Sequence, residues 1–298
     1  MATIIIKELK ITNSIGDSIQ FGRHFKLING FDLSALSANV SYSKSTKDGA
    51  NYQRTVLDIR DFDLEFFIDR QYLDDLWIEE KRQEIFRVFN PSLNPMRLDF
   101  TTKGGSSYYL TANLESAPSL PQGFENENKA WQKGLLQFTC GDPRIYSAKS
   151  QVVEIASWIG SFKFPLEIPD GIGIQMGYRN PSLIGNVVND GGSTGMIIQF
   201  KALASLSKPS LINVNTYEQL KLNCNMQGGD VIEVSTFVGN KTVTLIRNNV
   251  RSDLMPAVDL HSIFFQLAPG DNLFRYDAVS GIDNLEVRMI FTPQFAGV

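Results

Sequence analysis

The chain has 298 residues, of which 43% are hydrophobic and 20% are charged, as is usual for a folded protein. This length allows one large domain or two medium ones, and the net charge of −4 excludes the basic footprint of a nucleic-acid-binding protein. No apolar run has the length of a membrane span or of a signal-peptide core, so we expect a protein made in a cytoplasm and not inserted in a membrane.

The first part of the chain, residues 1–143, is predicted to be a β domain with one helix. Apolar and acidic side chains alternate over residues 58–68, which predicts a strand with Ile59 and Phe62 on its apolar face. The polar stretch 41–52 before it is expected to form an exposed loop or the tip of an extended hairpin.

Apolar residues at three- and four-residue steps predict a helix over about residues 69–89. Its apolar positions are Leu73, Leu76, Trp77, Ile85, Phe86 and Phe89. Asn90-Pro91 ends the pattern, because the residue before proline leaves helical dihedral space. The turn sequence Gly141-Asp142-Pro143 is the expected domain boundary.

Residues 144–298 have no clear helical pattern and are predicted to form an antiparallel β-sandwich. Short apolar runs are separated by Gly-Asp or Gly-Asn turns, as at Gly229-Asp230, Gly239-Asn240 and Gly270-Asp271. The predicted strands include 162–168, 196–202, 210–215, 219–224, 231–236, 242–247, 262–267, 273–277 and 285–292. Regular spacing of such short strands is typical of a sandwich.

Reactive residues are few and widely separated. His261 has Asp259 and Ser262 beside it, but no nucleophile elbow supports a catalytic triad. The two cysteines, Cys140 and Cys224, are expected to be buried free thiols, although the sequence does not exclude a disulfide between them. Two histidines and two cysteines give no zinc-ligand spacing. We therefore expect no enzyme activity, no catalytic residue, no metal and no cofactor.

Two other patterns leave alternatives open. Asp61, Asp63 and Glu65 share one side of the predicted strand, so they form either a hydrated outer face, which we favour, or a site for a hard cation. Trp158 is the one tryptophan of the second part. It fits core packing or an interdomain contact better than a saccharide platform, but it is the candidate residue if the sandwich binds sugar.

Several phrases occur in a fixed order along the whole chain. They are Ile11–Ile19, Ile85–Pro91, Phe138–Pro143, Phe164-Pro165-Leu166, Gly229–Thr236, Lys241-Thr242-Val243, Phe264–Asn272 and Phe291–Val298. In this order and spacing the chain resembles the distal tail protein (Dit) family of siphophages, which are bacteriophages with long, non-contractile tails.

The resemblance implies a virion structural protein made in the host bacterial cytoplasm. The first domain would form a homohexameric ring between the tail tube protein and the tail-tip protein, and the second would be a galectin-like sandwich. Receptor-binding or accessory baseplate proteins are further expected partners. Within the polar stretch 41–52, we expect Ser43, Lys44, Lys47, Asp48 and Asn51 to contact a neighbouring subunit or the tail tube. The alternative function is recognition of a host-surface saccharide by the sandwich.

Overall fold

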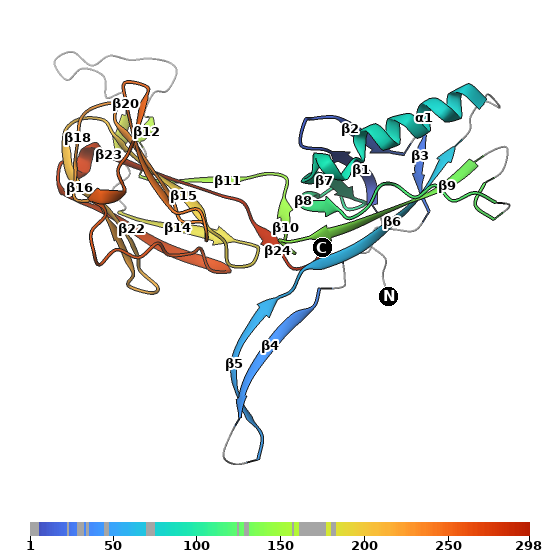
Figure 1. Cartoon of the computed structure of the whole chain (residues 1–298). Helices are drawn as coiled ribbons and strands as arrows, with labels where there is room; N and C mark the ends of the chain where they lie inside the picture. Colours follow the sequence, from blue (N-terminus) through green and yellow to red (C-terminus); the bar gives the residue numbers. More distant parts are fainter. Residues whose placement is uncertain are drawn as a thin grey trace. The chain divides into compact units, whose positions relative to one another are not determined.

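The computed structural model (Figure 1) describes residues 6–22, 24–28, 33, 36–44, 48–69, 75–123, 125–127, 131–156, 158–160, 177–179 and 183–298. The chain folds into two compact units. The first comprises Met1–Lys149 together with Phe295–Val298, and the second comprises Ser150–Gln294. The chain therefore leaves the first unit once and returns to it.

The first unit is built on a nine-stranded sheet with the order β2-β1-β7-β8-β9-β6-β3, in which β10 pairs with both β8 and β24. The strands are β1 Ile6–Thr12, β2 Ser18–Phe21, β3 Phe25–Leu27, β6 Arg60–Asp69, β7 Met96–Thr102, β8 Ser107–Leu114, β9 Trp131–Cys140, β10 Ile145–Ser147 and β24 Gln294–Phe295. Every second side chain of β6 is buried, from Arg60 to Ile68. The expected apolar face was wrong at Ile59, which is 49% exposed, because the buried register begins with Arg60.

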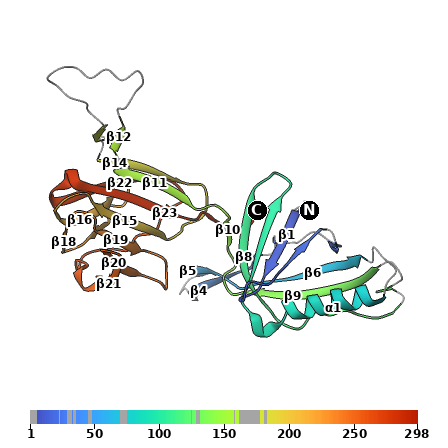
Figure 2. The ribbon, with the colours of Figure 1, turned by 90° about the horizontal axis from the view of Figure 1, so that it is seen from above.

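Helix α1 (Asp75–Val88) contacts β2 and lies close to it in Figure 1, and Figure 2 shows the same helix from above. Ile85 and Val88 are buried in the core of the first unit, but Phe86, expected on the apolar face, is 43% exposed. The helix also begins later than predicted. Asp69 is still part of β6, where it pairs with Trp131, and a residue held in a ladder cannot open a helix. A short 3-10 turn, η1 (Pro91–Leu93), follows α1.

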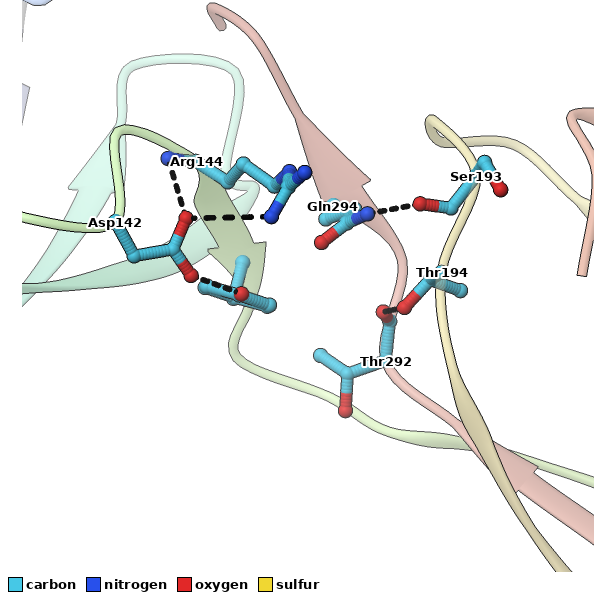
Figure 3. Close-up of polar contacts among 7 residues, drawn as sticks. Asp142, Arg144, Ser193, Thr194, Thr292 and Gln294 are labelled. Atoms are coloured by element: carbon cyan, nitrogen blue, oxygen red, sulfur yellow. Dashed lines mark hydrogen bonds and ion pairs between the residues drawn. The ribbon is translucent and has the colours of Figure 1, made fainter. Parts of the chain in front are cut away.

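The sequence Gly141-Asp142-Pro143 lies inside the first unit, before the division at Lys149 and Ser150. The Asp142 carboxylate accepts a hydrogen bond from the Tyr146 hydroxyl at 2.5 Å and one from the Arg144 backbone amide at 3.3 Å (Figure 3). These bonds tie the turn to β10, which continues the first sheet. The segment is therefore a braced turn and not an interdomain linker.

The second unit is an antiparallel β-sandwich, which confirms the predicted fold class. One sheet has the order β11-β23-β15-β19-β20-β21, and the other has β14-β22-β16-β17 with β18 beside β16. The bounds are β11 Gln151–Ala156, β14 Ile184–Asn189, β15 Met196–Ala202, β16 Leu206–Asn213, β17 Gln219–Lys221, β18 Asn225–Met226, β19 Val231–Ser235, β20 Thr242–Arg247, β21 Val250–Asp253, β22 Gly270–Ser280 and β23 Leu285–Phe291. The second unit also has two 3-10 turns, η2 (Met255–Ala257) and η3 (Ile282–Asn284). Strands β12 (Trp158–Gly160) and β13 (Gly177–Arg179) pair with each other in a separate two-stranded sheet. Buried side chains of both sheets, such as Phe200 and Tyr276, form one core.

Two predicted strands of the second unit have a different outcome. The predicted strand 162–168 lies outside the described residues. The predicted strand 262–267 is wrong: Phe265 and Leu267 are buried alternately, but only Leu267 makes a bridge, to Thr194. Alternation of apolar and polar residues indicates which side of an extended segment is buried. It does not show whether a neighbouring strand is present to form a ladder.

The segment that follows β23 is fixed within the second unit by two contacts drawn in Figure 3. The Thr194 hydroxyl donates to the Thr292 carbonyl at 3.3 Å, and the Gln294 side-chain amide donates to the Ser193 carbonyl. Residues 292–294 are therefore held in place directly before the chain returns to the first unit.

Candidate assembly surface on the hairpin of β4 and β5

Strands β4 (Ala38–Lys44) and β5 (Ala50–Leu57) pair only with each other, in a two-stranded antiparallel sheet. In Figure 1 this hairpin stands away from the other strands of the first unit. The ladder runs from Ala38 opposite Leu57 to Lys44 opposite Ala50, with a shift of register between Ser41 and Tyr42. The polar stretch predicted to be a loop or a hairpin tip is thus the outer part of an extended hairpin.

No residue of β4 or β5 is buried, and every residue of β5 is exposed. In contrast, every second residue of β6, the next strand along the chain, is buried. An isolated two-stranded hairpin is marginally stable in water, and strands without neighbours offer unpaired backbone groups to other chains. A contact with another chain would therefore stabilise the hairpin, and the unpaired backbone groups of its strands can form hydrogen bonds in such a contact.

One face of the hairpin carries an apolar and aromatic row. Opposite residues of an antiparallel ladder share a face, so Val40, Tyr42 and Tyr52 lie on the same side, with Leu57 nearer the base. The rings of Tyr42 and Tyr52 meet edge to face with 6.2 Å between their centroids, and these side chains are 62% and 60% exposed. The Tyr52 hydroxyl donates to the Thr55 hydroxyl at 3.0 Å, across the irregular part of the strand. Exposed tyrosines preordered in this way are typical of interface anchors.

The opposite face of the hairpin is more polar. Arg54 lies on it opposite Ser41, and Val56, which is 52% exposed, lies on it opposite Asn39. Lys44 follows Tyr42 by two residues and so shares the face of the aromatic row, and Asp48 is the exposed acidic residue of the turn region. At the base, the Asp58 amide donates to the Ser37 carbonyl at 3.0 Å, which extends the ladder by one bond beyond the strands.

The structure places the predicted contact residues on this hairpin. Ser43 and Lys44 end β4, Asn51 lies near the start of β5, and Asp48 lies in the bend between the strands. The Ser43 hydroxyl reaches the Asn51 carbonyl at 3.5 Å. Lys47 lies outside the described residues. Their role in assembly stays a prediction.

Sequence reasoning missed the aromatic row. The run Tyr52 to Leu57 is rich in aromatic and β-branched residues, which was a usable strand signal. The polar residues of the turn concealed that signal, because a strand exposed on both faces has no alternation of apolar and polar residues.

The other sequence candidates do not form a site in the described part of the chain. No group of His, Cys, Asp and Glu residues there is arranged to hold a metal ion. Of the three carboxylates on β6, Asp61 and Asp63 are exposed, whereas Glu65 pairs with Lys133 at 3.0 Å. Trp158 belongs to β12, and its side chain lies outside the described residues.

His261 has an almost fully exposed side chain, 3.4 Å from the Asp259 carboxylate. The Ser262 hydroxyl donates to the Lys221 carbonyl and accepts from the Lys221 amide, so it braces a loop against β17.

No described helix is long and apolar enough to cross a membrane.

Comparison with known proteins assigns both units to phage tail families. Residues 13–140 match the model of the phage tail protein RIFT-related domain, and residues 192–295 match that of the siphovirus-type tail component, C-terminal domain. None of the curated proteins matches the chain.

Among solved structures, the chain is similar to the Dit protein (gp 19.1) of bacteriophage SPP1, described as a paradigm of the hub adsorption apparatus in phages that infect Gram-positive bacteria. The TM-score is 0.63 at 13% identity, over 96% of this chain and 99% of that one. It is also similar to a chain of the phage p2 baseplate in its activated conformation with Ca, with a TM-score of 0.52 at 11% identity over 98% of this chain and 99% of that one.

Identities this low show a shared fold alone, but the two family models match in order along most of the chain. They confirm the resemblance seen in the sequence. The chain belongs to the distal tail protein (Dit) family of siphophages and is a structural component of the bacteriophage tail.

Proposed function

We propose that this protein is the distal tail hub of its virion, and that six copies form a ring joining the tail tube to the tail-tip and adsorption apparatus. The hub description of the SPP1 protein and the baseplate origin of the p2 chain support this role. In the proposal the protein is made in the bacterial cytoplasm, has no catalytic activity, and also contacts receptor-binding or accessory baseplate proteins.

The observation that carries the proposal is the hairpin of β4 and β5. A ring requires a heterologous contact, in which one surface of each copy meets a different surface of the next. A hairpin exposed on both faces, with an aromatic row on one of them, is suited to reach over a neighbouring copy. Ser43, Lys44, Asp48 and Asn51 would then lie at or near the part that reaches furthest, and the proposed contact set also includes Lys47.

The test measures the mass of the purified protein in solution by light scattering over a range of concentrations, alone and with the tail tube protein. We expect a hexamer in at least one of these conditions. The double variant Tyr42→Ser/Tyr52→Ser should weaken assembly by about 1,000-fold, since two aromatic interface anchors at about 2 kcal/mol each contribute about 4 kcal/mol.

Tyr217→Ser is the matched control, because Tyr217 is an 86% exposed tyrosine of the second unit. It should leave the mass unchanged. Deletion of residues 43–50 should have an effect at least as large as that of the double variant. A monomer in every condition contradicts the ring, and normal hexamers after the deletion contradict the role of the hairpin.

A further inference from the structure

Arg60 is a charged residue in a core position. It opens β6, its side chain has the inward register of Phe62, and it is 2% exposed. Its guanidinium donates one hydrogen bond to the Leu33 carbonyl and another to the Ala296 carbonyl. Burying a guanidinium is costly unless its donors are satisfied, so these bonds are important for the local structure.

The three segments joined by Arg60 have different places in the chain. Leu33 is 1% exposed and precedes β4, the entering strand of the hairpin, whereas Arg60 follows β5, the leaving strand, by a short connection. Ala296 belongs to residues 295–298, here called the return segment, which follow the second unit in the chain. One side chain thus holds both ends of the hairpin and the return segment together.

The return segment has its own anchors in the first unit. Phe295 packs edge-on against Tyr108 with 5.7 Å between ring centroids, and Val298 packs against the core of the first unit. Strand β24 also pairs with β10. The Ala296 carbonyl is therefore presented to Arg60 by a segment held on both sides.

We propose that Arg60, with the return segment, fixes the base of the β4–β5 hairpin and so holds it in the orientation needed for assembly. This inference rests on the proposed role of the hairpin in the ring. Because both faces of the hairpin are exposed, only its base can set its direction within the free subunit. A hairpin already ordered before contact loses less conformational freedom on binding, which favours assembly. Arg60 is then a positioning residue, since it acts through the hairpin.

Arginine is suited to this task by its shape. The guanidinium is planar and carries five N–H donors in a fixed fork, so it can bond two carbonyls of different segments at once. A lysine ammonium is a single point of charge on a flexible stem, and we expect it to keep one of the two contacts. Methionine is similar to the apolar stem of arginine and has no donor.

The test is hydrogen exchange on the full-length protein, read at the Asp58 amide and along the β4–β5 ladder. In Arg60→Met we expect exchange there to be faster by about tenfold or more, as for the loss of a hydrogen bond to a charged group. Exchange along the β7–β8 ladder should stay unchanged, and Arg60→Lys should give an intermediate rate at Asp58. Assembly of both variants should weaken in the same order.

Phe295→Ala is an independent variant in which Arg60 is intact and the return segment loses its ring contact. It should also speed exchange at Asp58, and it keeps the inference testable if Arg60→Met does not fold. Arg97→Met is the matched control, because Arg97 is a half-exposed arginine on β7. It should leave exchange at Asp58 unchanged.

The exchange result does not depend on the ring, so the two proposals can fail separately. If the wild-type protein never forms a ring, the proposed function fails, while exchange at Asp58 still tests the base of the hairpin. Unchanged exchange at Asp58 in both Arg60→Met and Phe295→Ala overturns the inference. Faster exchange throughout the first unit overturns it too, since Arg60 would then be a general core residue. Normal assembly with a loosened hairpin would overturn the link to assembly.

Discussion

Asp230 shows how one residue of a Gly-Asp turn stabilises the sandwich. Its carboxylate accepts two hydrogen bonds from Arg247, at 2.8 and 2.6 Å, and one from the Gln227 amide at 2.7 Å. The Arg247 guanidinium is the main cause that lowers the pKa of Asp230. Asp230 was recognised in the sequence only as part of a Gly-Asp turn. In the structure it is a buried acceptor of hydrogen bonds from Arg247 and Gln227.

We expect Asp230→Asn to lower the free energy of unfolding by about 2 kcal/mol at pH 7, the usual contribution of hydrogen bonds to a charged group. A carboxyl with a lowered pKa contributes fully above its unfolded pKa, about 3.9, and its contribution falls as pH drops through the folded value. The difference between wild type and variant should therefore close in acid, below about pH 4. Urea unfolding across pH measures it. Glu286→Gln, which removes an exposed pair with Lys201, should change stability by about 0.5 kcal/mol or less.

The two thiols give a second prediction at this scale. Both cysteines are free, and they lie in different units. Burial raises the pKa of the Cys140 thiol to about 12 and raises that of Cys224 as well. Since the thiolate is the reactive form, we expect no fast reaction of Cys140 with a thiol reagent at pH 8 until the protein is unfolded. Rapid labelling of Cys140 in the native protein would contradict its buried position.

The β20–β21 hairpin is an element whose turn can be tested directly. Two residues, Asn248 and Asn249, connect the strands, with φ values of 50° and 62°. Positive φ at both positions is the requirement of a type I′ turn, which glycine meets at least cost at the second position. Asn249→Gly should keep or raise stability, and Asn249→Val should lower it by about 1–2 kcal/mol, the cost of a left-handed residue. Thermal unfolding distinguishes the two variants, and equal melting temperatures would contradict this account of the turn.

Elements with a local signal could be predicted from the sequence, and those that depend on distant partners could not. The strands Met196–Ala202 and Thr242–Arg247 were predicted at their observed bounds, because apolar side chains of each pack on the core of the second unit and turns flank them. The buried register of Arg60 was available from its spacing to Phe62 and Leu64, but a charged side chain conceals an inward position. The bond to Ala296 has no sequence signal, because 236 residues separate the partners.

At the scale of the whole molecule, the two units have separate cores, so we propose that they are separate folding domains. Residues 150–294 are continuous, and a fragment of these residues should fold alone with a cooperative thermal transition. Residues 1–149 without the return segment lack β24, one of the two strands that pair with β10, and should be less stable than the same unit in the whole chain. Calorimetry of the whole protein and of both fragments tests this, and an unfolded 150–294 fragment would contradict it.

The pairing of β10 with β24 has a consequence for how such proteins diversify. Neighbouring strands of a sheet lie about 4.8 Å apart. The second unit follows β10 and precedes the end of β24, so its two ends are attached to adjacent strands of the sheet in the first unit. A folded domain whose ends lie close together can occupy such a position without re-threading the sheet around it. We therefore expect that the second unit can be replaced by another domain with adjacent ends while the sheet of the first unit keeps its strand order.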